Sequence, residues 1–406
     1  MTPLSRRSFL STTAVAGALS AAAGAAPAVA LPWQPKSLER PLPLAETSTP
    51  ALIVDIDQVE ANLKTMADYL KARGMGLRPH TKTHKCPYLA HRQMALGAVG
   101  VCCAKVSEAE VMAASGLTEI LITSPVVTRE KIDRVIALAK NCTGLQIVID
   151  QAQNATDFDA AARAAGIRLG VLIDLESGTR RTGVPMGDAA AALARHIAPL
   201  KHLRLDGIQC YGGHVMHIGD FESRKAASLS MLAEARDTRL RIEADGIPLR
   251  NFTGGGTGTY DIDVAVEGMT DLQCGSYLVM DLQYGILGAP EGRIYDTFPQ
   301  AMFVWSTAIS QPVPGSMTID AGLKAMYRDS PRPELRGITG VTYGIGGDEH
   351  GILSLENPSR PIRLGDKLAL LPSHCDPTIN LYDHFHACRN DRVEALWPIS
   401  ARGMSQ

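Results

Sequence analysis

The feature that most constrains this chain is a regular alternation between residues 75 and 275. Short runs rich in β-branched residues alternate there with Ala-rich stretches whose apolar residues recur at helical spacing, for example over 107–114, 129–140, 152–165, 187–197 and 221–245. The candidate strands occupy residues 75–79, 100–103, 119–123, 146–150, 170–174, 207–211, 250–253 and 272–275. Eight strands with crossovers are the number in a (β/α)8 barrel, so we predict an α/β fold built on a TIM-type barrel.

The glycines argue against the main alternative, an open doubly wound sheet. Such a sheet typically has a Gly-rich turn after its first strand. Here the glycine cluster, residues 254–256 and 258, follows the seventh candidate strand. Barrels commonly bind phosphate in the loops after strands seven and eight, so the position of this cluster favours the barrel and an anion site within it.

The sequence pattern changes after about residue 287. Short β-rich runs with turn residues between them replace the helical pattern, at 302–309, 316–320, 339–343, 351–355 and 367–371. This predicts a separate C-terminal β domain. Residues 49–55 also read as a strand, which precedes the barrel and is expected to pair with the β domain. We therefore divide the chain into segments 1–30, 31–55, 56–285 (barrel) and 286–406 (β domain).

The first thirty residues are typical of an export signal. Arg6 and Arg7 are followed by Ser-Phe-Leu, residues 8–30 carry no charge, and Ala28-Val29-Ala30 forms a small-x-small cleavage site. The paired arginines indicate the twin-arginine (Tat) machinery, which exports folded proteins. The stretch is too rich in small residues for a membrane anchor. We expect a periplasmic or otherwise exported protein with no stable membrane association after cleavage, whose eight cysteines are buried free thiols.

The charge balance excludes one class of partner. The 40 Lys and Arg residues against 42 Asp and Glu give a net charge of −2. A nucleic-acid surface needs a basic excess to neutralise phosphates, so no nucleic-acid partner is expected.

Polar residues gather where the first and the last two candidate strands end. The first strand runs into the motif Arg78-Pro79-His80-Thr81-Lys82-Thr83-His84-Lys85. A solvated cationic loop is the plain alternative, but cations so close together favour a bound anion. The glycines after strands seven and eight let backbone N–H groups converge on a phosphate. A lysine facing a phosphate site suits pyridoxal phosphate (PLP).

These motifs resemble the D-threonine aldolase and D-serine dehydratase family, PLP enzymes of the alanine-racemase-like fold type III. The resemblance covers nearly all of the mature chain. It implies that Lys82, with Lys85 as the rival, binds the cofactor covalently and that a homodimer forms. It further implies a cofactor site with His80, Arg181, Gln209, Tyr211, Thr253, Gly254, Gly255, Gly256, Thr257, Gly275, Ser276 and Tyr277.

A second cluster, His374-Cys375-Asp376-Pro377, lies near the C-terminus. In an extended chain His374 and Asp376 share a face and can bind one cation, although the spacing alone favours a turn. The resemblance implies a divalent cation held by His374 and Asp376. Cysteine at the second position resembles the dehydratases, which favour zinc, whereas Asp376 resembles the aldolases. We therefore expect Mn²⁺ ahead of Mg²⁺ or Zn²⁺.

Other polar clusters have weaker interpretations. His384, His386 and Cys388 alternate and could bind zinc, but they lie outside the family pattern and are expected to be surface or packing residues. By resemblance, Glu349 and His350 could support the metal or the cofactor.

The resemblance implies retro-aldol cleavage of small D-3-hydroxy amino acids to glycine and an aldehyde, with His217 as candidate base and His214 second. The alternative with the same cofactor is dehydration of D-serine or 3-hydroxy-D-aspartate to a 2-oxo acid and ammonia, and Asp376 discriminates against it. A metal-dependent barrel hydrolase would not need the lysine and the phosphate loops. A non-catalytic PLP-binding protein would have no use for the metal pair.

Overall fold

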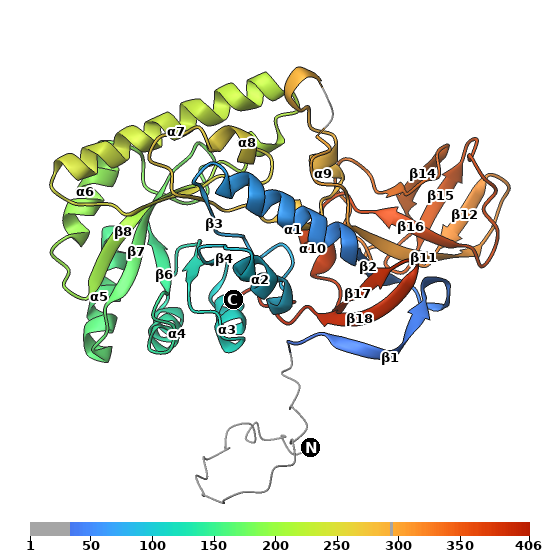
Figure 1. Cartoon of the computed structure of the whole chain (residues 1–406), viewed down its shortest axis with the longest axis horizontal. Helices are drawn as coiled ribbons and strands as arrows, with labels where there is room; N and C mark the ends of the chain where they lie inside the picture. Colours follow the sequence, from blue (N-terminus) through green and yellow to red (C-terminus); the bar gives the residue numbers. More distant parts are fainter. Residues whose placement is uncertain (1–32, 293–294) are drawn as a thin grey trace, which may run out of the picture. The chain divides into compact units, whose positions relative to one another are not determined.

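The computed structural model describes residues 33–292 and 295–406 (Figure 1). The predicted export signal, residues 1–30, lies outside these described residues, so it stays a prediction. Within the described part, no helix combines the length and the apolar character needed to cross a membrane.

Eight parallel strands form the barrel, in the order β3-β10-β9-β8-β7-β6-β5-β4. Backbone contacts just beyond β3 close the cylinder, because His80 bridges Cys102 and Thr81 N donates to Cys102 O at 2.9 Å. The strands are β3 (Gly76–Leu77), β4 (Val101–Cys103), β5 (Ile120–Ile122), β6 (Gln146–Ile149), β7 (Leu169–Leu175), β8 (Leu203–Cys210), β9 (Asn251–Gly254) and β10 (Asp271–Leu272). The predicted TIM-type barrel is confirmed.

Helices follow the strands and cover the outside of the barrel (Figure 1). Side chains at their ends fix several of them; for example, Asp220 accepts from Ser223 N and starts α7, and Gly166 ends α5 in the left-handed region. The helices are α1 (Ile56–Lys71), α2 (Pro87–Ala95), α3 (Val106–Ala114), α4 (Arg129–Ala139), α5 (Ala152–Ala165), α6 (Asp188–Ile197), α7 (Phe221–Ala244), α8 (Tyr260–Asp263) and α9 (Leu282–Gly285).

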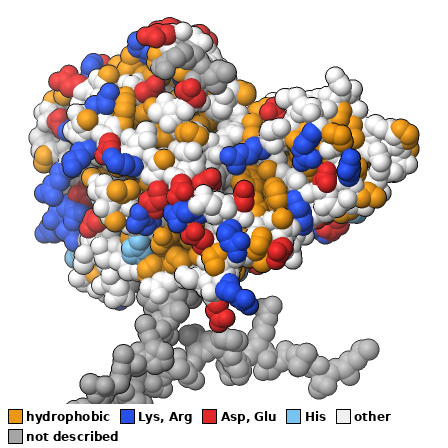
Figure 2. Space-filling view, turned by 45° about the vertical axis from the view of Figure 1, so that its right-hand side comes forward, with side chains coloured by type: hydrophobic (Ala, Val, Ile, Leu, Met, Phe, Trp, Pro, Cys, Tyr) orange, Lys and Arg blue, Asp and Glu red, His pale blue; other side chains and the backbone are white. Residues whose placement is uncertain are grey.

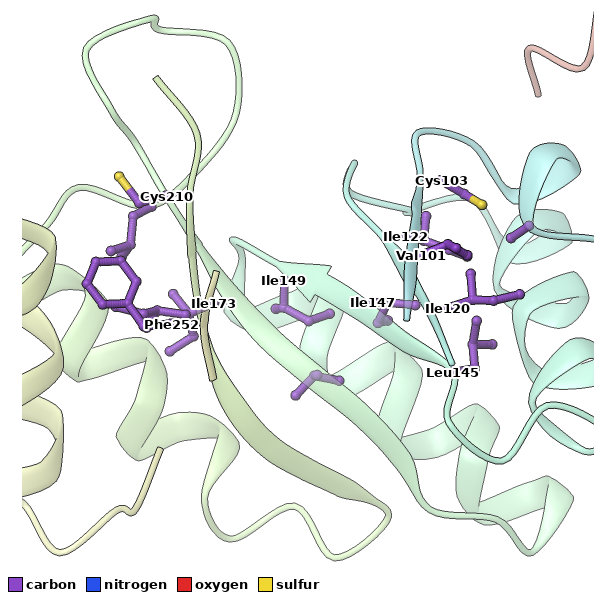
Figure 3. Close-up of a cluster of buried hydrophobic side chains, with 14 of the residues drawn as sticks. Val101, Cys103, Ile120, Ile122, Leu145, Ile147, Ile149, Ile173, Cys210 and Phe252 are labelled. Carbon is purple, nitrogen blue, oxygen red and sulfur yellow. The ribbon is translucent and has the colours of Figure 1, made fainter. Parts of the chain in front are cut away.

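Alternation along the strands separates an apolar outer layer from a more polar interior. Val101, Ile120, Ile122, Ile147 and Ile149 are buried among the residues of the large core that includes the surrounding helices (Figure 3). Their neighbours Cys102, Leu121, Val148 and Leu172 form a separate small cluster. Farther around the barrel, the alternate positions on β7 to β10 carry buried polar side chains, and these are the ones closest to the candidate site.

The second sheet has ten strands and forms the β domain. As expected, the strand that precedes the barrel joins it: β2 pairs antiparallel with β11 and parallel with β17. Strands β1, β17 and β18 were not among the predicted strands. The strands are β1 (Lys36–Pro43), β2 (Ala51–Asp55), β11 (Met302–Ser310), β12 (Ser316–Ile319), β13 (Glu334–Leu335), β14 (Val341–Ile345), β15 (Gly351–Leu355), β16 (Lys367–Leu371), β17 (His384–Arg389) and β18 (Arg392–Pro398).

All eight cysteines are buried and free, as the export argument predicted. On the face shown in Figure 2, Asp and Glu side chains lie among Lys and Arg side chains.

Candidate active site

A pocket lies at the C-terminal ends of the barrel strands, where TIM barrels place their chemistry. It is lined by polar and small residues from β3, β8, β9 and β10 and the segments that follow them. The lining residues are His80, Lys82, Thr83, Tyr211, Met216, Gly256, Thr257, Gln273, Gly275, Ser276 and Tyr284.

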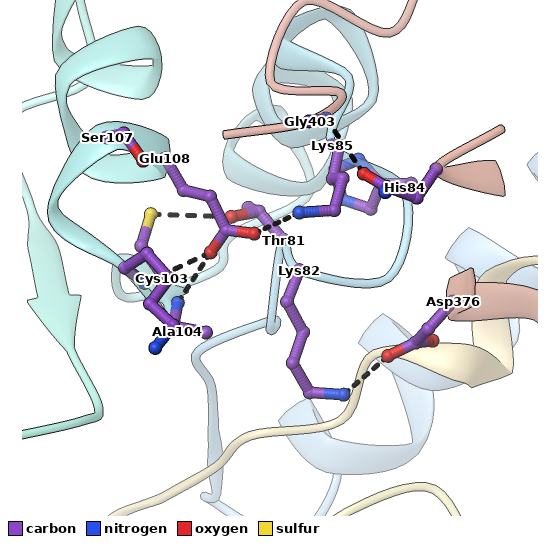
Figure 4. A network of polar contacts seen from close by, with 12 residues as sticks. Thr81, Lys82, His84, Lys85, Cys103, Ala104, Ser107, Glu108, Asp376 and Gly403 are labelled. Atoms are coloured by element: carbon purple, nitrogen blue, oxygen red, sulfur yellow. Dashed lines mark hydrogen bonds and ion pairs between the residues drawn. The ribbon is translucent and has the colours of Figure 1, made fainter. Parts of the chain in front are cut away.

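The structure separates the two candidate lysines (Figure 4). Lys82 lines the pocket, and its side chain is 37% exposed. Lys85 is only 10% exposed and forms an ion pair with Glu108 of α3, away from the pocket lining. Because Lys85 is engaged with Glu108 away from the pocket, Lys82 is the lysine available there for covalent chemistry.

Lys82 meets the C-terminal cluster directly. Its Nζ donates to Asp376 Oδ2 at 2.5 Å (Figure 4). Burial alone would lower the pKa of Lys82, but the Asp376 carboxylate raises it above its ordinary value. Conversely, burial would raise the pKa of Asp376, but Lys82 and His374 hold it well below its usual range. The barrel and the β domain therefore contribute to one site.

His374 is oriented by a carboxylate that no sequence motif had assigned. Its Nδ1 lies 2.9 Å from Oδ2 of the fully buried Asp281, which also accepts from Cys375 N at 2.9 Å. This leaves His374 Nε2 for a ligand, and a carboxylate behind a histidine is the usual support of a metal site. Asp281 lies shortly after the last barrel strand, in the segment of Met280 and Tyr284 that resembles the family, but neither its position nor the resemblance indicated this support.

The local conformation is closer to the turn that the spacing alone favoured than to an extended chain. His374 is extended, but the five-residue helix α10 (Cys375–Ile379) begins directly after it, so His374 and Asp376 do not share a strand face. Within residues 33–292 and 295–406, the group of three potential ligand atoms within 4.8 Å of one another is Asp281, His374 and Cys375. Because Asp281 is committed to supporting hydrogen bonds, His374 and Asp376 remain the better donor pair for a hard cation.

Two glycines of the loops after β9 and β10 lie so close to neighbouring residues that no side chain would fit there. A Cβ on Gly256 would lie 2.4 Å from Met216 Sδ, and one on Gly275 would lie 2.4 Å from Thr83 Oγ1. These two glycines, with Thr257 and Ser276, line the pocket. Small residues, hydroxyl groups and backbone N–H groups opposite a lysine fit the phosphate and aldehyde ends of PLP.

Arg224 anchors this loop from behind. Its guanidinium is fully buried and donates only to backbone carbonyl oxygens: Nε to Gly258 (2.9 Å), and Nη1 to Ile218 (2.6 Å) and Gly219 (3.2 Å). A third nitrogen, Nη2, donates to Gly288 at 2.5 Å. One side chain thus fixes the glycine loop relative to the turn that carries His217.

Asp263 lies beneath the same loop, where Thr259 and Ser228 donate to it at 2.5 and 2.6 Å. Burial raises its pKa from 3.8 to about 7. A folded pKa above the unfolded value stabilises the fold at low pH, and the stabilisation is lost as pH rises through about 7. For Asp263→Asn we consider the Tm difference, variant minus wild type. We expect this difference to be larger at pH 8 than at pH 5 by about 2 °C or more. Thermal unfolding of both proteins at the two pH values measures this, and an equal difference contradicts it.

Several predicted cofactor residues lie behind the pocket lining. The Tyr277 ring is fully buried in the core, where its hydroxyl accepts from Gln93 at 3.0 Å. Gln209 and Thr253 are buried and engaged in hydrogen bonds inside the barrel. Gly254 and Gly255 belong to the glycine loop but not to the pocket lining. These five residues lie outside the pocket lining.

Others stand at or near the pocket. Tyr211 and His80 line it, and Arg181 lies with its guanidinium carbon 5.2 Å from the centroid of the Tyr211 ring. His217 is exposed, with its ring centroid 5.1 Å from that of the pocket residue Tyr284. His214 is also exposed.

The remaining clusters are not brought to this site. Glu349 pairs with Lys324 at 2.5 Å, and both line a separate hollow in the β domain together with His350. Among the described residues, no hydrogen bond or ion pair joins this hollow to Lys82 or His374. His384, His386 and Cys388 lie on β17, where Cys388 is buried.

Comparisons with known proteins match both the barrel and the β domain. A family model described as "Alanine racemase, N-terminal domain" matches residues 54–281, and one described as "Putative serine dehydratase domain" matches residues 301–388. A 3-hydroxy-D-aspartate aldolase of Paracoccus denitrificans (strain Pd 1222) is 39% identical over 362 residues, 88% of this chain and 93% of the relative. A D-threonine aldolase of Arthrobacter sp. is 38% identical over 364 residues, 90% of this chain and 95% of the relative.

The solved structures agree as well. The crystal structure of D-threonine aldolase from Filomicrobium marinum superposes with a TM-score of 0.86 at 40% identity, covering 90% of this chain and 98% of that one. A D-threo-3-hydroxyaspartate dehydratase of Delftia sp. (strain HT23) is more distant, at 26% identity over 378 residues, 87% of this chain and 97% of the relative.

Fold and site together thus define a PLP-type barrel with a C-terminal β domain. The chain belongs to the alanine racemase N-terminal domain family, within the group that joins this barrel to a serine dehydratase domain.

Proposed function

We propose that this chain is a PLP-dependent lyase that cleaves D-3-hydroxy amino acids, such as D-threonine or 3-hydroxy-D-aspartate, to glycine and an aldehyde. The observation that carries the proposal is the hydrogen bond between Lys82 and Asp376, because it brings the cofactor lysine and a ligand for a hard metal ion into one site. Relatives at 38 and 39% identity are aldolases, whereas the dehydratase relative is at 26%.

The chain's own residues divide the work. Lys82 would hold PLP, and the loops with Gly256, Thr257, Gly275 and Ser276 would hold its phosphate. When bound, PLP supplies an electron sink for the electron pair left on the α-carbon of the substrate. His374 and Asp376 would hold a divalent cation, with Mn²⁺ favoured by the carboxylate oxygen. This cation supplies a Lewis acid for the 3-hydroxyl group.

Breaking the Cα–Cβ bond requires removal of the proton on the 3-hydroxyl group. His217 is the candidate base, since it stands at the pocket beside Tyr284 and desolvation lowers its pKa, which keeps the imidazole neutral and able to accept. A dehydratase would instead need a metal that helps the hydroxyl group depart. The carboxylate of Asp376, in place of a thiolate, favours the aldolase.

Stereochemistry and substrate class can be tested together. Purified holoenzyme with Mn²⁺ is assayed for aldehyde release from D-threonine, L-threonine and 3-hydroxy-D-aspartate. The proposal predicts release from D substrates only. Release from L-threonine at an equal rate would refute it.

Replacing His217 with alanine should lower kcat for cleavage by about 10²- to 10⁴-fold, the range for loss of a general base. The visible absorbance of bound PLP should persist, because His217 is not a pocket-lining residue. The matched control is His214→Ala, which is expected to retain most of the activity. Full activity of His217→Ala would remove this residue from the role.

We further propose that the enzyme acts outside the cytoplasm, after Tat export, and as a homodimer. Arg6 and Arg7 support export, and the family resemblance supports the dimer, which sedimentation of the purified enzyme tests.

Export has its own test in the full-length chain. Wild type should appear in the periplasmic fraction, whereas Arg6→Lys combined with Arg7→Lys should stay in the cytoplasm with intact activity. Equal distribution of the two proteins between the fractions would contradict Tat export.

A further inference from the structure

A chain of buried hydrogen bonds runs through the barrel interior beside the pocket. Gln209 donates from Nε2 to Asp174 Oδ1 at 2.8 Å and to Thr123 O at 3.1 Å. Its Oε1 accepts from Gln273 Nε2 at 3.1 Å. Asp174, Gln209 and Gln273 are all at least 97% buried, and only Gln273 among them lines the pocket.

One end of the chain fixes the orientation of both amide groups. A carbonyl oxygen can only accept, so the group of Gln209 that faces Thr123 must be its NH₂. Asp174 is a second acceptor for the same nitrogen. Gln209 must therefore turn its oxygen toward Gln273. Only the NH₂ group of Gln273 can donate a hydrogen bond to that oxygen.

The other end gives the same orientation independently. The Thr253 hydroxyl has one hydrogen, and it is donated to Asp271 Oδ1 at 2.6 Å. Asp271 is paired with Arg78 at 3.0 Å, which keeps the carboxylate an acceptor. Thr253 Oγ1 must then accept from Gln273 Nε2, 3.1 Å away. Both hydrogens of this nitrogen are thus used inside the barrel.

The remaining polar atom of Gln273 is its Oε1, which has no hydrogen-bond partner among residues 33–292 and 295–406. Gln273 therefore offers the pocket an acceptor and not a donor. The phosphate group of PLP, and its ring hydroxyl in the ionised form, can only accept. The ring nitrogen is different, because it donates when it carries a proton.

We infer that Gln273 Oε1 accepts a hydrogen bond from the protonated ring nitrogen of the cofactor, in an orientation that Thr253 fixes directly and that Thr123 O and Asp174 fix through Gln209. The inference rests on the proposed cofactor. An acceptor at this place selects the protonated ring, which withdraws electrons more strongly than the neutral ring. Burial raises the pKa of Asp174 to about 6, so near neutral pH it still acts mainly as an acceptor.

The test compares the binding of PLP with that of its deaza analogue, in which C–H replaces the ring nitrogen. Apo-protein is titrated with each compound, and the readout is the ratio of the two dissociation constants. Wild type should bind the analogue about tenfold or more weakly, the cost of one charge-assisted hydrogen bond. The ratio should fall toward one in Gln273→Met.

Variants at Asp174, which is behind the pocket lining, are the controls for general packing around Gln273. Asp174→Asn still offers an oxygen acceptor to Gln209, and Thr123 O and Thr253 still fix both amides, so the ratio should be preserved. Asp174→Glu keeps an acceptor and should preserve the ratio even if both affinities weaken. If Gln273 had a purely structural role, every variant would weaken the binding of PLP and of its analogue by the same factor.

The outcomes distinguish this inference from the proposed function. Equal affinity of wild type for PLP and its analogue, or a high ratio that persists in Gln273→Met, overturns the inference alone. Failure of wild type to bind either compound overturns the proposed cofactor. In wild type loaded with PLP labelled with ¹⁵N in the ring, the ¹⁵N chemical shift should be that of a protonated pyridine, and the shift of a neutral ring contradicts the inference.

Discussion

Replacing Lys82 with alanine is expected to lower kcat/KM for cleavage by more than about a thousandfold, the scale of losing a covalent catalytic group. Within the described residues, Lys82 is the one lysine that lines the pocket. The variant should also lose the visible absorbance of lysine-bound PLP, and its apo-protein should fold with a lower Tm, because Asp376 loses its ion-pair partner. Aldehyde release and the absorption spectrum measure the two effects.

Lys85 provides the matched control. Lys85→Met leaves the 3% exposed Glu108 carboxylate without its partner and should lower the Tm, whereas Lys85→Met with Glu108→Gln should recover part of it. The folded fraction of the double variant should retain activity and lysine-bound PLP. Borohydride reduction of wild type, followed by peptide mapping, should label Lys82. A label on Lys85, or an active Lys82→Ala variant, would overturn the assignment.

Removing the metal site is expected to have the second largest effect. His374→Ala, or chelation of wild type with EDTA, should lower kcat by about 10²-fold or more, because the 3-hydroxyl group loses its Lewis acid. Asp281→Asn should weaken metal affinity by about 10- to 100-fold and leave activity at saturating Mn²⁺ closer to wild type, the pattern of a supporting carboxylate. Metal titrations of the holoenzyme followed by activity measure both.

His384→Ala is the control for general histidine loss, since His384 lies on β17 away from the pocket lining. It should keep wild-type metal dependence. Undiminished activity of thoroughly chelated enzyme, or of His374→Ala without added metal, would show that this site plays no part in cleavage.

The barrel could be predicted because its signal is local and repeated. Each strand is a short apolar run, and helices such as α5 have a clear helical period. The strands β1, β17 and β18 carry mixed charged and apolar residues. Although β17 and β18 form a local hairpin, β1 pairs with β18 and β17 pairs with β2 across more than 300 residues of sequence. Propensity alone does not reveal such long-range pairing.

The site shows the same division. Glycine loops and the Lys82 motif were visible as runs of unusual residues, and both line the pocket. The support of His374 by Asp281 joins residues 93 positions apart, so spacing could not show it. Local spacing favoured a turn at His374 and Asp376, and the short helix α10 does begin between them. Local spacing also could not show that Lys85 would form a buried ion pair with Glu108.

The most direct test of the central claim identifies the bond that is broken. Holoenzyme with Mn²⁺ is incubated with uniformly ¹³C-labelled D-threonine, and the products are followed by NMR. Retro-aldol cleavage at the Lys82, His374 and Asp376 site predicts glycine and acetaldehyde in equal amounts. The ¹³C–¹³C bond within glycine and the one within acetaldehyde should both remain intact. Formation of 2-oxobutanoate and ammonia, with the four-carbon chain unbroken, would contradict it.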